Sequence, residues 1–265
     1  LALLCGHLGK PRSGLSPFRG QNNVQGGGGD MGPIPNNLPG YQPVDDDEVL
    51  DKFEAEWGVR PPDEVGLRIT EMFSAIPGSE ETVSGGDGDD AYGGDDDEPE
   101  RGTDDPSAEE GYTPDNTDLH GMYIVGENPA VSEPDLDHAE EALKALDFLV
   151  VQELFMTETA KHADVVLPAA SLAEKSGTIT NTERRVQRVR PAVESPGEAR
   201  TDAAILQDLA GRLGVDWDYD SPADVMDEIS DLAPIYGGVT NERLEEQQNG
   251  LQWPCWDEDH PGTPH

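Results

Sequence analysis

Two short apolar runs, joined by a brief connection, constrain the fold of this chain most strongly. DFLVV occupies residues 147–151 and DVVLP occupies residues 164–168. Each run is apolar and valine-rich after its aspartate, which is typical of strands covered on both faces in a parallel sheet. Residues 156–163 between them favour a short helix that Thr157 can cap. We therefore expect two parallel strands joined by a right-handed crossover.

The segment before these runs extends the pattern to a larger unit. MYIV at residues 122–125 predicts a strand, GENP a turn, and residues 134–146 a helix. The order strand, helix, strand, helix, strand is typical of an α/β fold. The expected fold class is a doubly wound, Rossmann-like parallel sheet domain, accompanied by irregular, loop-rich segments.

Polar side chains follow the predicted strands, where such folds bind ligands. Glu127, Asn128, Gln152 and Asp164 could bind a guanine edge or ribose hydroxyls. Asp164 has an alternative role as a cap at the start of its strand. The first strand is not followed by GxGxxG, so the usual dinucleotide fingerprint is absent and a nucleotide would need another binding mode.

A long segment upstream, residues 13–43, is too rich in Gly, Pro and Asn for regular structure. Loops of this length are usually functional or disordered. It contains one arginine among neutral hydrogen-bonding groups: Arg19, Gln21, Asn22, Asn23 and Gln25. A guanidinium pairs bidentately with a carboxylate or phosphate, which suits a small planar anion. The alternative is a surface loop with an ordinary arginine.

Elsewhere, apolar spacing predicts helices at residues 47–57, 69–76, 202–213 and 222–232, and a short apolar anchor at 251–256. The segment after Pro168 is interpreted as a polar tail. Five of the 17 basic residues lie in it: Arg184, Arg185, Arg188, Arg190 and Arg200. They predict either ion pairs on an acidic surface or a wall beside an anionic cofactor.

The formal net charge is −39, from 56 acidic and 17 basic residues. Self-repulsion of this size opposes compaction unless salt screens it. We expect a protein adapted to high salt, with the binding of cations or basic partners as the alternative. No basic face is available for nucleic acid or an anionic membrane. Residues 79–118 form an acidic insert with few large apolar side chains, predicted to be disordered, and they lack the spacing of a calcium-binding loop.

Cys5 and Cys255 are too few and too distant for a metal site, and the six histidines lack zinc-ligand spacing. We expect no protein-ligated metal and two inert thiols. No apolar run approaches the roughly 20 residues of a membrane span. The chain begins at Leu1 without a signal peptide, so we expect a cytoplasmic fragment of a longer protein.

Several blocks together resemble the catalytic alpha subunit of molybdopterin-dependent formate dehydrogenases, in the molybdopterin oxidoreductase superfamily. They cover most of the chain outside the acidic insert and include RGQNNVQG, MYIVGENP, VQELFMTETAKHADVVLP, NTERRVQRVR and LQWPC. The GENP and ADVVLP segments are shared across the superfamily. RGQNNVQG with NTERRVQRVR is what indicates formate.

The resemblance implies a bis-molybdopterin guanine dinucleotide cofactor with Mo or W. The residues expected to bind it are Gly126, Glu127, Asn128, Gln152, Thr157, Thr159 and Asp164. Arg19 and Gln21 are the expected catalytic residues, with Arg19 orienting the carboxylate of formate as it is oxidised to CO2. Electrons would leave through iron–sulfur clusters, with a [4Fe-4S] cluster in an upstream part, to other formate dehydrogenase or electron-transfer subunits.

The family's metal-ligating cysteine or selenocysteine would precede Leu1, so we expect the fragment to be inactive alone. Residues 1–21 are expected to end a preceding domain, and residues 22–78 with 119–170 to form the α/β domain. Residues 171–200 and 221–265 would pack on a neighbouring domain, with the 201–220 helix returning to the α/β domain. Two alternatives stay open: another molybdopterin oxidoreductase acting on a different small anion, or a non-catalytic subunit of the superfamily, as in respiratory NADH dehydrogenase.

Overall fold

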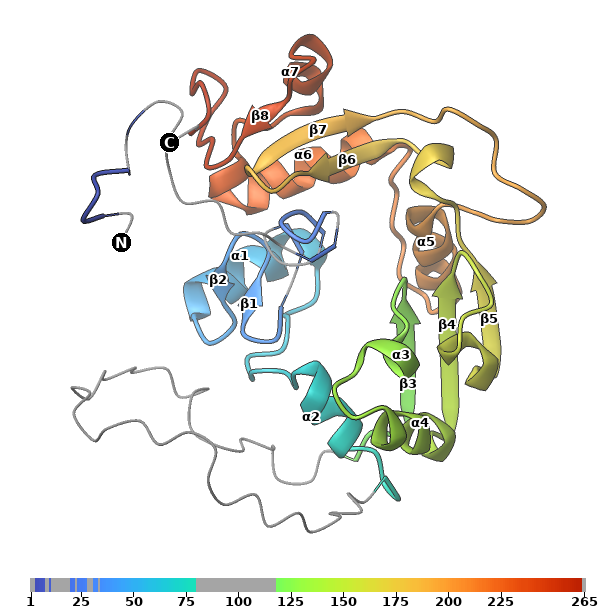
Figure 1. Ribbon diagram of the computed structural model, residues 1–265. Helices are drawn as coiled ribbons and strands as arrows, with labels where there is room; N and C mark the ends of the chain where they lie inside the picture. Colours follow the sequence, from blue (N-terminus) through green and yellow to red (C-terminus); the bar gives the residue numbers. More distant parts are fainter. Residues whose placement is uncertain are drawn as a thin grey trace, which may run out of the picture. The chain divides into compact units, whose positions relative to one another are not determined.

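The computed structural model describes residues 3–7, 10, 20–21, 23–27, 31–32, 34–79 and 118–263 (Figure 1). The chain divides into two compact units. The α/β unit comprises Leu67–Leu167, and the hairpin unit comprises Leu1–Gly66 with Pro168–His265. This division differs from the predicted boundaries, because residues 22–66 and the helix in 201–220 group with the hairpin unit. Residues 80–117, most of the predicted acidic insert, lie outside the described residues.

The sheet of the α/β unit has three strands in chain order, β3 (Gly121–Val125), β4 (Phe148–Glu153) and β5 (Val165–Pro168). β3 and β4 are parallel, with Gly121 opposite Phe148 and Val125 opposite Gln152. Figure 1 shows the three arrows pointing the same way. The predicted α/β class with a parallel sheet is therefore confirmed.

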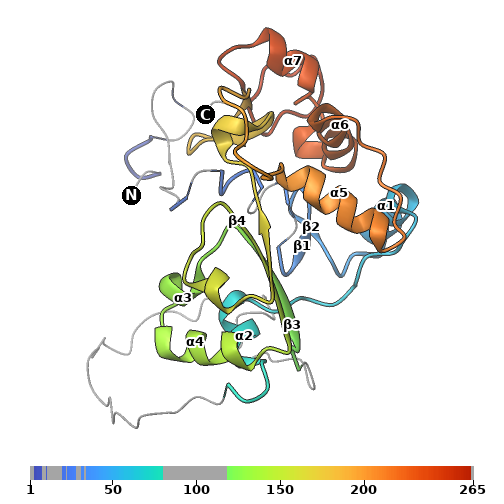
Figure 2. The same ribbon diagram turned by 90° about the vertical axis from the view of Figure 1, so that its right-hand side faces the viewer.

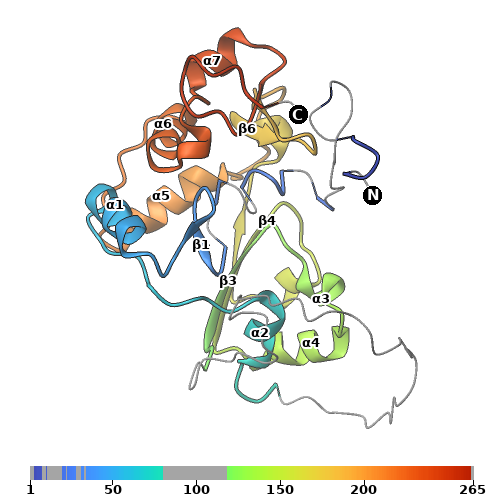
Figure 3. The same ribbon diagram turned by 90° about the vertical axis from the view of Figure 1, so that its left-hand side faces the viewer.

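Three helices pack against this sheet, α2 (Ile69–Ser74), α3 (Pro129–Ser132) and α4 (Leu136–Ala145). Figure 3 shows them gathered on one side of β3 and β4. Their apolar faces share a core with the strands, formed by Phe73, Ile76, Ile124, Ala139, Ala142, Leu143, Leu149, Val151 and Ala160. The single turn of α3 was not predicted; it begins at Pro129, where a missing N–H costs nothing.

Two expectations for the strand pair need correction. β4 was predicted to be covered on both faces, but Leu149 and Val151 are buried while Phe148 is 51% exposed. The burial alternates because successive side chains of a strand point to opposite faces. The predicted helix over residues 156–163 is only a 3₁₀ turn, η2 (Thr159–His162). The N-cap residue of this turn is Glu158 and not the predicted Thr157, although the Thr157 Oγ1 accepts from the Ala160 N–H at 3.2 Å.

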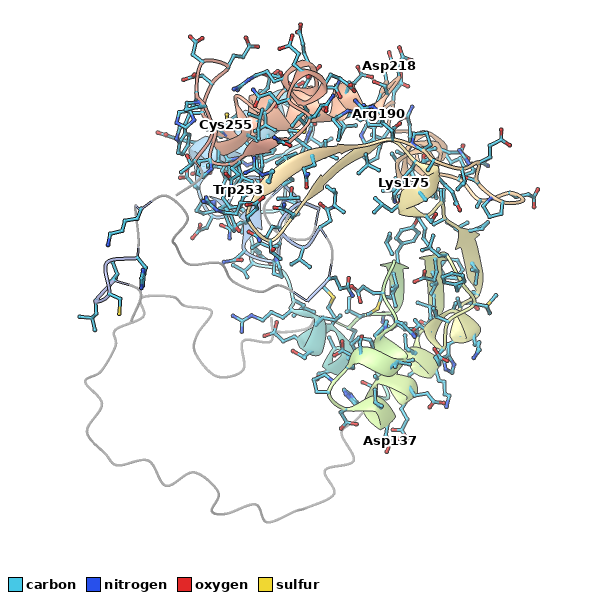
Figure 4. All side chains as sticks on the ribbon, turned by 45° about the horizontal axis from the view of Figure 1, so that its top comes forward. Asp137, Lys175, Arg190, Asp218, Trp253 and Cys255 are labelled. Carbon is cyan, nitrogen blue, oxygen red and sulfur yellow. The ribbon has the colours of Figure 1, made fainter. Side chains whose placement is uncertain are left out.

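The segment interpreted as a polar tail is an antiparallel hairpin, which is a third correction. β6 (Gly177–Thr180) pairs with β7 (Arg185–Val189), and β7 pairs with β8 (Leu251–Gln252). Val186 of β7 is fully buried and packs in a core cluster with Met31, Met226, Ala233, Tyr236, Val239, Leu244, Leu251, Trp253 and Cys255. This cluster confirms the predicted apolar anchor near the end of the chain. Figure 4 labels Trp253 and Cys255 in it.

The remaining elements of the hairpin unit are mostly helical. They are β1 (Asn37–Leu38), β2 (Gln42–Pro43), α1 (Asp47–Trp57), η3 (Leu172–Glu174), α5 (Asp202–Arg212), α6 (Pro222–Leu232), η4 (Pro234–Tyr236) and α7 (Asn241–Glu246). Figure 2 gives a clear view of α5, α6 and α7. The bounds of α1 and α6 match the predicted helices, and α5 ends one residue early. No helix among the described residues has the length and apolar character needed to cross a membrane.

Candidate functional site

The carboxyl edge of the β3–β4 pair gathers most of the predicted ligand-binding residues. β3 ends at Val125, and Gly126 then takes a left-handed conformation with φ of 66°. The Gly126 N–H donates to the Gln152 carbonyl at 2.9 Å. The GENP turn therefore begins beside the end of β4, and a residue with a side chain would be strained at its first position.

A side-chain network joins the two loops of this edge. The Asn128 Oδ1 accepts from both the backbone N–H and the hydroxyl of Thr159, at 3.0 Å and 2.7 Å. The Thr159 Oγ1 in turn accepts from the Ala130 N–H at 3.1 Å. Thr159 is fully buried. Asn128 and Thr159, both predicted to bind a ligand, hold the loop after β3 against the loop after β4.

Glu158 belongs to the same network and was not among the predicted site residues. Its Oε2 accepts from the Asn128 Nδ2 at 2.9 Å. This hydrogen bond, and secondarily a backbone hydrogen bond and the charge of Lys161, hold the pKa of Glu158 below its usual value. An ionised acceptor therefore stands at this edge at neutral pH. The signal for Glu158 in the sequence was its position between Thr157 and Thr159, which were both predicted to bind the cofactor.

Gln152 and Asp164 lie at opposite ends of the strands. Gln152, near the carboxyl end of β4, is fully buried, and the Tyr123 hydroxyl donates to its Oε1. Asp164 precedes β5, and its Oδ2 accepts from the Leu149 N–H at 2.8 Å near the amino end of β4. The structure therefore brings six of the seven predicted residues to the carboxyl edge and places Asp164 elsewhere. The contact with Leu149 matches the alternative role of Asp164 at the start of its strand.

A second candidate site lies in the hairpin unit, where Asn23 and Gln25 contact the end of β6 and the turn that follows it. The Asn23 Oδ1 accepts from the Thr180 N–H at 2.8 Å. The Gln25 Nε2 donates to the carbonyls of Thr182 and Asn181, at 3.0 Å and 3.4 Å. Two motifs separated by more than 150 residues, RGQNNVQG and NTERR, are therefore in direct contact.

A cavity of about 300 Å³ lies at this contact. Its lining is neutral, formed by the amide, hydroxyl and apolar side chains of Gln21, Asn23, Val24, Gln25, Ile179, Thr180, Asn181, Thr182 and Gln187. Arg19, the predicted anion-binding residue, lies outside the described residues. Among the described residues, Gln21 lies at a defined cavity.

The arginines that follow Pro168 all have partners within the hairpin unit. Arg184 donates to the carbonyls of Trp253 and Thr263, at 2.8 Å and 3.0 Å, and its guanidinium lies 5.3 Å from the Trp253 ring centroid. The ion pairs of the others are Arg185–Glu183, Arg188–Glu245, Arg190–Glu245 and Arg200–Asp208. Four of the five arginines thus make the ion pairs that one of the two interpretations expects, whereas Arg184 binds backbone carbonyls. Arg190 is labelled in Figure 4.

No group of three or more His, Cys, Asp or Glu side chains in the described ranges is arranged to hold a metal ion. In that part of the chain, Cys5 is exposed and Cys255 is buried, both as free thiols. The site chemistry of the described residues is therefore that of amides, hydroxyls, carboxylates and backbone groups.

Formate dehydrogenase alpha subunits are among the known proteins to which this chain is similar. It is 44% identical over 265 residues to the F420-dependent formate dehydrogenase subunit alpha of Methanocaldococcus jannaschii, covering 99% of this chain and 33% of that protein. It is 41% identical to the F420-dependent formate dehydrogenase 1 subunit alpha of Methanococcus maripaludis, covering 100% of this chain and 33% of that protein. A putative formate dehydrogenase of Staphylococcus haemolyticus is 41% identical over 96% of this chain and 22% of its own length. The chain thus spans a third or less of these relatives.

A solved structure, acetylene hydratase from Pelobacter acetylenicus, matches with a TM-score of 0.43 and 20% identity, over 52% of this chain and 19% of that one. The profile of the family "Molybdopterin oxidoreductase" matches residues 1–212. That match includes both candidate sites. The chain therefore belongs to the molybdopterin oxidoreductase family.

Proposed function

We propose that this chain is a segment of a formate dehydrogenase alpha subunit, which oxidises formate to CO2 in the complete enzyme and is inactive by itself. The observation that carries the proposal is identity of 41–44% over nearly the whole chain to formate dehydrogenase alpha subunits. The two blocks that indicate formate, RGQNNVQG and NTERR, also contact each other in the hairpin unit. A cytoplasmic location and partner subunits that accept electrons through iron–sulfur clusters, including an upstream [4Fe-4S] cluster, are parts of the same proposal.

The carboxyl edge of the α/β unit fits a guanine dinucleotide in its donor and acceptor groups. Guanine presents N–H donors and ribose presents hydroxyl donors. Carboxylate oxygens can accept hydrogen bonds from both. Glu158 supplies an ionised acceptor that Asn128 orients, and Glu127 stands in the same turn as Asn128. We assign the binding of the dinucleotide to Gly126, Glu127, Asn128, Gln152, Thr157 and Thr159, with Glu158 added. Asp164 is left out because it lies at the amino end of the strands.

The cofactor would supply the redox chemistry, since Mo or W in a bis-molybdopterin guanine dinucleotide can accept the two electrons that formate loses. This chain's own part is to bind and orient formate. The carboxylate of formate matches the planar geometry of the Arg19 guanidinium, which can donate two parallel hydrogen bonds. Gln21 supplies neutral amide groups at the cavity beside this loop. Oxidation of formate to CO2 then releases one proton and two electrons.

The test is Arg19→Lys in the complete enzyme. Lysine keeps the charge but loses the bidentate geometry, so we expect formate oxidation to be lost while the metal content stays unchanged. Arg212→Lys is the matched control, because the Arg212 side chain is 74% exposed and pairs only with Asp208 in the described structure. Retained formate oxidation in Arg19→Lys would contradict the role of Arg19. Turnover of another small anion, but not of formate, by the unaltered enzyme would favour a different molybdopterin oxidoreductase.

A further inference from the structure

The contact between residues 23–27 and the β6–β7 hairpin is made by side chains that bind backbone groups. Asn23 accepts the Thr180 N–H, and Gln25 donates to two carbonyls of the turn after β6. Gln25 is only 4% exposed. Leaving such a buried amide without partners costs more than the net strength of its hydrogen bonds. We call these contacts of Asn23 and Gln25 the amide clamp.

The turn that receives the clamp is itself held rigidly. The Asn181 Oδ1 accepts from the N–H groups of Glu183 and Arg185, both at 3.0 Å. Arg184 has a left-handed backbone with φ of 62°, and its guanidinium binds the Trp253 and Thr263 carbonyls. The carbonyls that Gln25 binds are therefore fixed by contacts on the far side of the turn.

The loop that carries the clamp is also tied at its other end. The Gly26 N–H donates to the Asn23 carbonyl, and the Met31 N–H donates to the Gly26 carbonyl, both at 3.0 Å. Met31 is buried in the same core cluster as Val186 of β7. The loop is thus held to the hairpin unit on both sides of Gly26.

Gly26 has a packing reason to be glycine. A Cβ at this position would lie 2.1 Å from the Asn23 Oδ1 and 3.0 Å from the Thr180 Oγ1. The space beside Gly26 is therefore filled by the carboxamide of the clamp. The Thr180 Oγ1 is buried there without a hydrogen-bond partner in the described part of the chain.

We propose that Asn23 and Gln25 are positioning residues, which hold the loop so that Gln21 is kept at the neutral cavity of about 300 Å³. Gln21 lies two residues before Asn23, and Arg19 two residues before Gln21. A loop released from the hairpin would lose the orientation that binding a small anion requires, and misplacement by about 1 Å can cost a hundredfold in rate. The consequence for formate rests on the function proposed above, whereas the clamp itself does not.

The experiment compares Gln25→Leu with Gln42→Leu in the complete enzyme. Gln42 is a matched control, because its Nε2 also donates to two carbonyls, those of Leu232 at 2.9 Å and Pro39 at 2.5 Å. We expect Gln25→Leu to raise amide hydrogen exchange of residues 23–27 about tenfold, from the loss of two hydrogen bonds. We also expect it to raise the KM for formate about tenfold, because ordering of the loop would have to accompany binding. Gln42→Leu should leave both readouts unchanged.

Two variants of Asn23 keep the test valid if Gln25→Leu fails to fold. Asn23 has a left-handed backbone with φ of 65°, which Gly and Asp both tolerate. Asn23→Gly loses the acceptor for the Thr180 N–H and should behave like Gln25→Leu. Asn23→Asp keeps the acceptor and should preserve slow exchange.

The two readouts separate the possible failures. Slow exchange of residues 23–27 in both Gln25→Leu and Asn23→Gly would overturn the clamp. Faster exchange with an unchanged KM for formate would overturn its positioning role. Absence of formate turnover in the unaltered enzyme would instead refute the proposed function, and hydrogen exchange would still decide whether the clamp exists.

Discussion

At the scale of single residues, Asn128 and Thr159 show that polar residues at a predicted binding site can form hydrogen bonds within the protein. The Asn128 Oδ1 and the Thr159 Oγ1 are committed to each other and to backbone N–H groups. Buried polar atoms are almost always paired in this way, because an unpaired one is costly. The atoms left to meet a ligand at this edge include the carboxylate of Glu158, which Asn128 orients.

We predict that Thr159→Val destabilises the protein by about 1–3 kcal/mol, because the nearly isosteric change leaves the Ala130 N–H without its acceptor. Thr159→Ser is the control, since it keeps the hydroxyl. The free energy of unfolding in urea measures both. Equal stability of the two variants would show that the hydroxyl network contributes nothing.

At the scale of elements, β7 and α7 are joined through one carboxylate. Arg188 lies in β7 and Arg190 directly follows the end of this strand, and both side chains bind Glu245 of α7. Hydrogen bonds from Arg188 and then Arg190 hold the pKa of Glu245 below its ordinary value of 4.5. The arginines therefore act as structural partners of a neighbouring helix.

The lowered pKa predicts a pH dependence for this contact. A carboxylate whose folded-state pKa is depressed stabilises the fold above its unfolded-state pKa and loses that contribution as the pH falls through the folded-state value. Glu245→Gln should therefore lower the melting temperature at neutral pH, and the gap from the unaltered protein should close as the pH falls below 4.5. Melting curves at several pH values measure this gap. A gap that persists at the lowest pH would mean that Glu245 acts through packing instead.

At the scale of the whole molecule, the charge of −39 dominates the solution behaviour. Repulsion among so many carboxylates opposes folding at low salt. The screening length falls to about 3 Å near 1 M salt, which removes most interactions between separated surface charges. The ion pairs of the described residues are mostly exposed, so each contributes little at any salt concentration.

We predict that the melting temperature rises as salt is added up to about 1 M, because screening relieves repulsion in the folded state more than in the expanded chain. Sodium and potassium chloride should act alike, since screening depends on ionic strength. Thermal unfolding followed by circular dichroism measures the effect. A rise with only one cation would favour specific cation binding, and no rise would contradict adaptation to high salt.

The sequence alone determined the elements whose signals are local. α1 begins after Asp46, whose Oδ1 accepts from the Glu48 N–H at 2.9 Å, and ends before Gly58, which is left-handed. The helix spacing, the strand runs and the family resemblance likewise depend on residues close together in the chain. These signals predicted α1, α6, β3 and β4 within a few residues.

Only the tertiary structure decided which distant groups meet. It placed Asp164 at the amino end of the strands, gave the arginines carboxylate and carbonyl partners, and turned the expected tail into a hairpin. It also brought Gln25 to the Thr182 carbonyl, 157 residues away. A local pattern cannot predict such contacts, because a buried amide or guanidinium binds whichever backbone group the fold presents to it. The sequence thus determined the family resemblance and the elements with strong local signals, and the packing of distant segments decided the hairpin and the roles of the polar residues.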